Sequence, residues 1–234
     1  MIKEELIQRS PVRVLEKSIH GGLKAGEIGI ITSAAAGVGK TSVLVQLALD
    51  KLLQEEKVIH VSFSQHTDYV LLWYADIFDE FTKKKDLVNT EEIKDDLVKN
   101  RVILNFNQDA VTGEQILKSL KALITEGAFN ASLIVIDGFD FSRTNRERME
   151  EIKAAAKELN ISIWYSCNTK ENGNGKNKIP AIVREYIDLL DAVIVLEPKA
   201  DHVELSALKY RNSTELGCIA LKLDPKTLLI LADS

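Results

Sequence analysis

The run Ser33–Thr41, which reads SAAAGVGKT, constrains this chain more than any other segment. A β-branched apolar run, Ile28–Thr32, precedes it, and Thr41–Leu53 follows with apolar residues at helical spacing. Strand, small-residue loop and helix, in that order, form the context in which a Gly-Lys-Thr sequence binds phosphate. Small residues let successive backbone N–H groups curl around an anion at the start of a helix, where the helix dipole favours negative charge.

Each part of this motif has a predicted role. We expect the loop backbone to hold the phosphates, Lys40 to reach their outer oxygens, and the Thr41 hydroxyl to bind Mg²⁺. Ala34 stands where the usual pattern has its first glycine. The alternative is that the small residues only allow close packing between the strand and the helix. The predicted nucleotide-binding residues are Ala34, Ala35, Ala36, Gly37, Val38, Gly39, Lys40, Thr41 and Ser42.

A second part of the same site is Asp137, which follows the apolar run Leu133–Ile136. An acid at the carboxyl end of a strand beside a phosphate loop is where such proteins hold Mg²⁺. Strands also end in Asp for local turn reasons, so Asp137 gains its weight from Lys40 and Thr41. Thr41 and Asp137 are therefore the predicted metal ligands, and ATP or another nucleoside triphosphate with Mg²⁺ is the predicted ligand.

Short β-branched runs alternate with longer helical patterns, which predicts an α/β fold with a mostly parallel central sheet flanked by helices. After residue 190 the strand-like runs follow one another with no helix-length pattern between them, which predicts antiparallel strands at one edge of the sheet. A helix is expected over Tyr69–Ile77, and a solvated helix with its flanks over Thr82–Asn100. The other predicted strands are Val58–Phe63, Val102–Phe106, Leu133–Ile136, Ile161–Tyr165, Ala192–Leu196, Val203–Lys209, Cys218–Leu223 and Thr227–Leu231.

Length and composition set the remaining limits. A chain of 234 residues with 45% hydrophobic content predicts a single domain over 1–234. The formal net charge of −5 gives the molecule as a whole no attraction for nucleic acid or anionic lipid. The apolar runs are much shorter than the roughly 20 residues that span a bilayer, and the first residues lack a signal-peptide core. With only Cys167 and Cys218 present, we expect a cytoplasmic protein without membrane association.

Several segments together resemble one family. Residues 21–27 (GGLKAGE), the strand and SAAAGVGKT resemble the opening of the RecA-like core shared by DnaB-type replicative helicases and KaiC-type ATPases. That group commonly carries alanine where Ala34 stands, and LIVIDGFD resembles its Mg²⁺ strand. The resemblance extends from about Pro11 to the last strand, and it implies a RecA-like P-loop NTPase fold with ATP and Mg²⁺. The candidate catalytic residues that it implies are Lys40, Asp137, Lys209 and Arg211.

Lys209 and Arg211, within LKYRN, resemble the Lys-x-Arg strand end by which one subunit of this family reaches the γ-phosphate bound to its neighbour. Their spacing of two on a predicted strand would project both from one face. The alternative is a strand edge that charge protects from pairing. The resemblance implies a homo-oligomer, with a hexameric ring as the expected form.

The departures from the family concern hydrolysis. The family carries a Glu that polarises the attacking water at the end of its second strand, but residues 62–66 read SFSQH, and the nearest acid is Asp68. The family's coupling Gln is replaced by Ser166-Cys167-Asn168. Loss of a general base lowers the rate by about 10²–10⁴-fold, whereas the phosphate cradle is separate from the base. We therefore expect weak or absent hydrolysis, although Gln65 or His66 could replace the acid.

Two basic loops could line the channel of a ring and contact a nucleic-acid backbone. They are 139–148, with Arg143, Arg146 and Arg148, and 170–178, with Lys170, Lys176 and Lys178. Neighbouring glutamates dilute this charge, so a solvated helix start and a surface loop are favoured over nucleic-acid binding.

Three functions therefore stay open for this chain. The favoured one is an ATP-dependent assembly or regulatory switch with little or no hydrolysis. The second is an active ATP-driven DNA helicase or recombination-type ATPase. The third is a structural adaptor with a relic phosphate loop.

Overall fold

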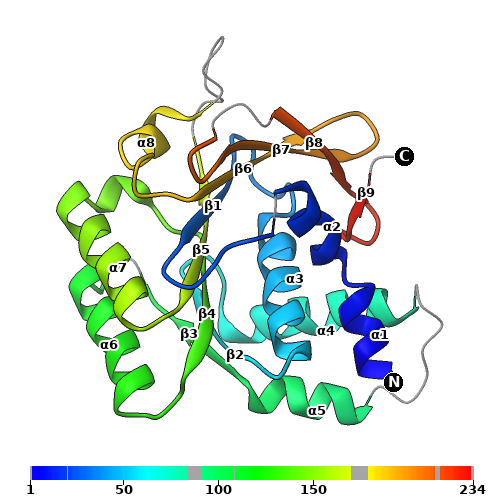
Figure 1. The fold of residues 1–234 in the computed structure, drawn as a ribbon, viewed down its shortest axis with the longest axis horizontal. Coiled ribbons are helices and arrows are strands. Elements are labelled where there is room, and N and C mark those ends of the chain that lie inside the picture. The colour runs from blue at the N-terminus through cyan, green and yellow to red at the C-terminus, as the bar shows by residue number, and fades with distance from the viewer. Residues whose placement is uncertain are drawn as a thin grey trace.

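The computed structural model describes residues 2–19, 21–83, 91–107, 109–169, 179–213 and 217–232. Within these ranges, nine strands form one sheet in the order β3-β2-β4-β5-β1-β6-β7-β8-β9 (Figure 1). Every pairing from β3 to β6 is parallel, and β6 to β9 pair antiparallel. The prediction of an α/β fold with a mostly parallel sheet and antiparallel C-terminal strands is confirmed. The strands are β1 Ile28–Ser33, β2 Lys57–Ser62, β3 Arg101–Asn105, β4 Ala131–Asp137, β5 Ser162–Asn168, β6 Ala192–Pro198, β7 Val203–Tyr210, β8 Gly217–Leu223 and β9 Ile230–Ala232.

Helices cover both faces of this sheet (Figure 1). Helices α1 to α5 pack on one face, and α6 to α8 with the short 3₁₀ helix η1 pack on the other. Four of them, α1, α2, α6 and α8, lie where no element was predicted. The helices are α1 Ile2–Gln8, α2 Pro11–Ser18, α3 Lys40–Leu53, α4 Thr67–Lys83, α5 Glu91–Lys99, α6 Gly113–Thr125, η1 Phe141–Arg143, α7 Arg146–Glu158 and α8 Ala181–Arg184.

The continuous apolar runs of the central strands follow from burial on both faces. Along β4, Leu133 and Val135 belong to the core on the α3 side, whereas Ile134 and Ile136 belong to the core on the α6–α7 side. Side chains alternate along a strand, so a strand between two helix layers needs apolar residues at every position. This is why a run such as Leu133–Ile136 indicated a central strand.

The strand order also positions the site. Strand β5 lies between β1 and β4, so the carboxyl ends of β1, β5, β4 and β2 meet along one edge. In open α/β sheets, ligands bind outside the carboxyl ends of the strands. The loops that follow these four strands carry most of the predicted site residues. Within the described part of the chain, no helix combines the length and the apolar character needed to cross a membrane.

Candidate functional site

The predicted metal ligands Thr41 and Asp137 lie next to each other. Thr41 is the second residue of α3, and Asp137 is the last residue of β4, 96 positions later. The Thr41 hydroxyl donates a hydrogen bond of 3.0 Å to Oδ2 of Asp137. The fold therefore brings together the two parts of the site that the sequence analysis paired.

The loop 34–39 between β1 and α3 depends on two glycines. Gly37 and Gly39 have φ values of +73° and +97°, which lie in the left-handed region that favours glycine. A Cβ on Gly39 would lie 2.8 Å from Cδ1 of Leu223, so a larger residue there requires the Leu223 side chain to shift. The backbone N–H of Ala35 donates to the hydroxyl of Ser33 at 3.2 Å, which holds the first turn of the loop.

The start of α3 is suited to an anion. Gly39 is its N-cap, and no side chain in the described chain caps it. The first N–H groups of a helix lack partners inside the helix and carry the positive end of its dipole. Ala34, Ala36 and Gly37 in the preceding loop are exposed to solvent, whereas Val38 and Ser42 are buried. An anion could therefore approach the helix end across the exposed part of the loop.

Lys40 is a buried amine beside this loop. Its side chain is 8% exposed, and Nζ donates to the carbonyl oxygen of Ala35 at 3.3 Å. Burial lowers the pKa of Lys40, and the nearby Cys167 and Asp137 act in the opposite direction. Burial without a close carboxylate costs free energy, which a bound anion would offset.

Three hydroxyl groups surround the buried Asp137 carboxylate. Besides Thr41, Ser64 donates to Oδ2 at 3.3 Å, and Ser166 donates to Oδ1. Ser166 also accepts a 2.9 Å bond from the N–H of Gly138, which orients its hydroxyl toward the carboxylate. The sequence analysis missed Ser64 and Ser166 as partners of Asp137 and named their segments only as departures from the family.

This donor set fits Mg²⁺ in the way that the ion is usually bound. Mg²⁺ keeps several waters and takes one or two carboxylates together with substrate phosphates, rather than a cage made by protein alone. Asp137 and Thr41 supply one carboxylate and one hydroxyl beside the loop. Among the described residues, no three His, Cys, Asp or Glu side chains gather into a metal-binding group.

The turn after β2 contains no acid beside Asp137. The Ser62 hydroxyl donates to the carbonyl of Gln65 and accepts from its N–H, and Asn105 donates to the same carbonyl. Asp68 lies beyond the turn, 80% exposed and 3.3 Å from His66. The side-chain oxygen of Gln65 is buried and lacks a hydrogen-bond partner in the described chain. Gln65 therefore keeps an unused side-chain acceptor within this turn.

Lys209 and Arg211 do not lie on one strand face, so this part of the prediction is wrong. Strand β7 ends at Tyr210, and Arg211 has φ +49° in the following turn. Lys209 donates to the carbonyls of Ile187 and Leu190, and burial lowers its pKa.

Arg211 is occupied within its own chain. It pairs with Glu27 at 2.8 Å, and its guanidinium stacks over the ring of Tyr210 at 4.7 Å. In the sheet, Tyr210 of β7 lies opposite Ala192 of β6, and Ala192 lies opposite Gly29 near the start of β1. The loop 34–39 follows the other end of β1. Lys209 and Arg211 therefore lie at the sheet edge opposite the loop 34–39, and their action on a neighbour's nucleotide stays a prediction.

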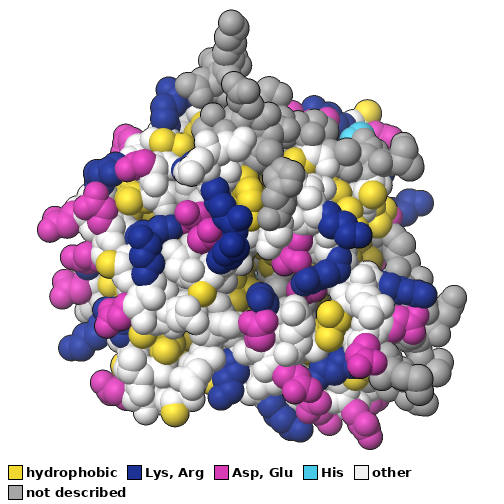
Figure 2. Space-filling view, viewed as in Figure 1, with side chains coloured by type: hydrophobic (Ala, Val, Ile, Leu, Met, Phe, Trp, Pro, Cys, Tyr) yellow, Lys and Arg dark blue, Asp and Glu magenta, His cyan; other side chains and the backbone are white. Residues whose placement is uncertain are grey.

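The arginines of the 139–148 loop are paired with acids. Arg143 is 2.6 Å from Asp109, Arg146 pairs with Glu150 and Asp188, and Arg148 pairs with Glu151. Figure 2 shows the same intermixing over the face viewed, where Lys and Arg side chains are interspersed with Asp and Glu. The second basic loop, 170–178, lies outside the described residues. Paired charges at this place favour a solvated helix start, as the sequence analysis preferred.

Comparison with models of known protein families finds no match for this chain, and no curated protein matches its sequence.

Proposed function

We propose that this chain is an ATP-binding protein of the RecA-like P-loop type, related to the DnaB and KaiC groups, with weak or absent hydrolysis. In this proposal the nucleotide acts as an assembly or regulatory switch. One observation carries the proposal. Lys40, Thr41 and Asp137 converge beside a glycine loop at a helix start, while the turn after β2 presents Ser64 to Asp137 in place of an acid.

Each residue then has a defined task. The loop backbone and the first N–H groups of α3 would bind phosphate oxygens, and Lys40 would neutralise the outer phosphate. Thr41 and Asp137 would hold Mg²⁺, which supplies charge neutralisation to the phosphates when it is bound. Ser64 and Ser166 are positioning residues, because their hydroxyls hold the Asp137 carboxylate in place.

Weak hydrolysis follows from the composition of the turn. Without a general base, the rate loses about 10²–10⁴-fold, so we expect turnover below the low end of ordinary kcat values, about 1 s⁻¹. Thermal stabilisation by Mg-ATP and phosphate release are to be measured on one preparation, with Lys40→Ala as the control. Stabilisation with turnover above about 1 s⁻¹ would contradict the switch. No stabilisation at all would favour the adaptor with a relic loop.

An active DNA-dependent ATPase is the second candidate, and Gln65 is the observation that favours it. A glutamine can orient an attacking water, as in some P-loop NTPases, and the Gln65 oxygen has no partner in the described chain. This candidate requires salt-dependent single-strand binding and hydrolysis that DNA stimulates. The wild type should show both the DNA binding and the DNA-stimulated hydrolysis. In Gln65→Ala the stimulation of hydrolysis by DNA should disappear.

The assembly is proposed to be a homo-oligomer, with a hexamer as the expected form. Tyr69 and Leu72 are 64% and 56% exposed near the start of α4, and their spacing of three places both apolar side chains on one face of the helix. Contiguous apolar surface is typical of interaction sites, and α4 starts directly after the turn that contacts Asp137.

Sedimentation with and without Mg-ATP tests this assembly. Leu72→Glu should prevent the larger species and keep Mg-ATP binding, whereas Val98→Glu on exposed α5 should assemble normally. A wild-type species that Mg-ATP leaves unchanged would remove the assembly from the proposal.

A further inference from the structure

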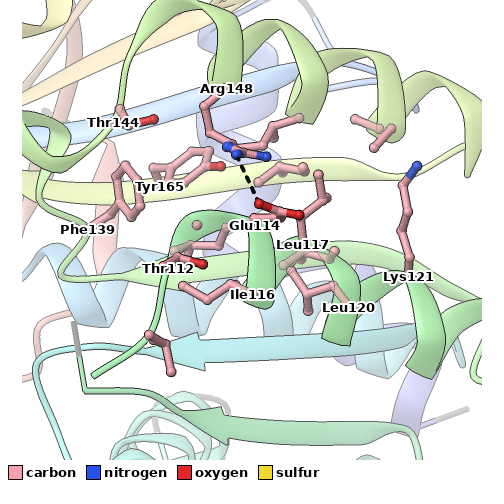
Figure 3. Close-up of a pocket in the computed structure, with 18 of the residues that line it drawn as sticks. Thr112, Glu114, Ile116, Leu117, Leu120, Lys121, Phe139, Thr144, Arg148 and Tyr165 are labelled. Carbon is pink, nitrogen blue, oxygen red and sulfur yellow. Dashed lines mark ion pairs between the residues drawn. The ribbon is translucent and has the colours of Figure 1, made fainter. Parts of the chain in front are cut away.

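A cavity lies between α6 and α7, on the side of the sheet where neither Lys40 nor α3 packs (Figure 3). Its volume is about 690 Å³, within the range of roughly 300–1,000 Å³ that is usual for small-molecule sites. Leu117 and Leu120 of α6 form one wall, and Ile134 and Ile136 of β4 lie on the floor. The cavity is thus lined mainly by aliphatic side chains of α6, α7, β4 and β5.

The cavity has a clear cause in the sequence of α7. This helix turns Ala155 and Ala156 toward the sheet, about one turn after Ile152 and two turns after Met149, both of which are larger. Alanine side chains do not fill the distance between a helix layer and a sheet, so space remains beneath the second half of α7. Interiors are otherwise close-packed, with few voids larger than a water molecule.

A buried hydroxyl points into this space. Tyr165 of β5 is 1% exposed, and its ring packs against Phe139 and Phe141 at centroid distances of 5.2 and 5.5 Å. Its hydroxyl makes no hydrogen bond to any residue in the described ranges. Figure 3 shows the hydroxyl directed between the two helices. Buried tyrosine hydroxyls normally have a partner, so this donor is available to a ligand.

The charged groups around the opening are balanced. Arg148 pairs with Glu151 and lies 3.9 Å from Glu114, which Figure 3 marks with a dashed line. Lys121 pairs with Glu158 at 3.1 Å. A guanidinium has five donors, so Arg148 can give one to a ligand while keeping an acidic partner. Tyr165 and Arg148 both offer donors, which calls for an acceptor on the ligand.

We propose that this cavity binds a small molecule with an apolar body and one oxygen acceptor, a carboxylate or a carbonyl. The apolar body lies against the leucines of α6 and the isoleucines of β4, and the acceptor oxygen receives hydrogen bonds from Tyr165 and Arg148. The site is separate from the loop 34–39, and the proposal does not depend on nucleotide binding.

Calorimetric titration with decanoate tests this site, because decanoate combines an unbranched apolar chain with a carboxylate. Decyltrimethylammonium has an unbranched alkyl chain of similar length and no acceptor, and it serves as the comparison amphiphile. Both are used below the concentration at which they form micelles. We expect decanoate to bind once per chain and decyltrimethylammonium not to bind there. Equal binding of the two, or no binding of decanoate, would overturn the proposal.

Two variants locate the site. Tyr165→Phe removes one hydrogen bond with almost no change of shape, and it should weaken decanoate binding about fivefold. Tyr74→Phe makes the same change on the opposite face of the sheet and should leave binding unchanged. Leu117→Trp fills the cavity and should weaken binding at least tenfold, whereas Val98→Trp on α5 should not.

Folding of each variant is checked by circular dichroism. Tyr165→Phe is nearly isosteric, so its decanoate affinity still tests the proposal if Leu117→Trp perturbs the fold. Unchanged affinity in folded Tyr165→Phe and Leu117→Trp would place decanoate elsewhere and overturn the proposal. A wild-type dimer that Leu117→Trp dissociates would show that a second copy occupies this space, which would also overturn it.

Discussion

The loop 34–39 offers a test of the site's construction, because its two glycines have different surroundings. Both have positive φ, +73° at Gly37 and +97° at Gly39. A Cβ on Gly37 would meet nothing within 4 Å, whereas a Cβ on Gly39 would lie 2.8 Å from Cδ1 of Leu223. Leu223 is fully buried and cannot move away without disturbing its neighbours. The same substitution to alanine should therefore have different costs at the two positions.

The magnitudes follow from these surroundings. Left-handed backbone costs a residue with a Cβ about 1–2 kcal/mol, and a less flexible unfolded chain returns part of it. Gly37→Ala should therefore lower the free energy of unfolding by about 1 kcal/mol. Gly39→Ala adds overpacking against Leu223, and the total should reach about 2–4 kcal/mol.

The assay is urea unfolding of both variants beside the wild type, followed by calorimetric melting. For a chain of this length, 1 kcal/mol shifts Tm by roughly 2–4 °C, so Gly39→Ala should melt roughly 4–16 °C lower and Gly37→Ala roughly 2–4 °C lower. Equal decreases in the free energy of unfolding of the two variants would refute the argument that Leu223 crowds a side chain at Gly39. A Gly39→Ala variant as stable as the wild type would refute the strained N-cap of α3 as well.

Three further predictions concern other parts of the molecule. Ser64→Glu places a carboxylate in the turn beside Asp137 and should raise ATP turnover at least tenfold, with Val98→Glu as the unchanged control. Burial lowers the pKa of His60 from 6.5 to about 4, so the folded protein keeps the imidazole neutral. Below pH 6.5 the unfolded chain binds a proton at His60 that the folded protein does not. The free energy of unfolding should therefore fall by about 3 kcal/mol between pH 6.5 and pH 4. Urea unfolding between these pH values should show that loss in the wild type and not in His60→Gln, while His66→Gln at an exposed site should behave as the wild type. Arg211→Ala removes a partly exposed ion pair with Glu27 and should lower the free energy of unfolding by about 1 kcal/mol or less. The variant should remain folded as a monomer, and its ATP-dependent assembly should be weakened. Sedimentation unchanged from the wild type would contradict a role for Arg211 between subunits.

The sheet was largely predictable because its central strands are buried on both faces. The run Leu133–Ile136 lies within β4, which starts two residues earlier and ends one residue later, and Ile28–Thr32 lies within β1, which ends one residue later. Helix α3 was predictable from its loop and its apolar spacing. Strand β6 was grouped with the antiparallel strands, yet it also pairs in parallel with β1, which no pattern within its own residues indicates.

Some of the missed helices had a signal in the sequence. Thr112 and Gln115 form a capping box at the start of α6, and Ser10 followed by Pro11 caps α2. Ser, Thr or Asp followed three residues later by Glu or Gln is a recognised helix start. Helix α6 begins with this start signal, so it could have been predicted from the sequence.

The contacts around the site were not predictable to the same degree. Ser64 and Ser166 reach Asp137 only because β2 and β5 flank β4, and a serine after a strand has many other uses. Arg211 was predicted on a strand, but its partner Glu27 is 184 positions away and the strand ends one residue earlier. The cavity depends on the spacing between α6, α7 and the sheet, which alternation and periodicity do not encode.

The central claim is that the loop 34–39, Lys40 and the Thr41–Asp137 pair bind ATP with Mg²⁺. Isothermal titration of Mg-ATP into the wild type and into Lys40→Ala tests it most directly. The account predicts one binding site per chain in the wild type, weaker binding when EDTA removes Mg²⁺, and loss of binding in a folded Lys40→Ala variant. No binding to the wild type, or equal affinity in the two proteins, would contradict the account.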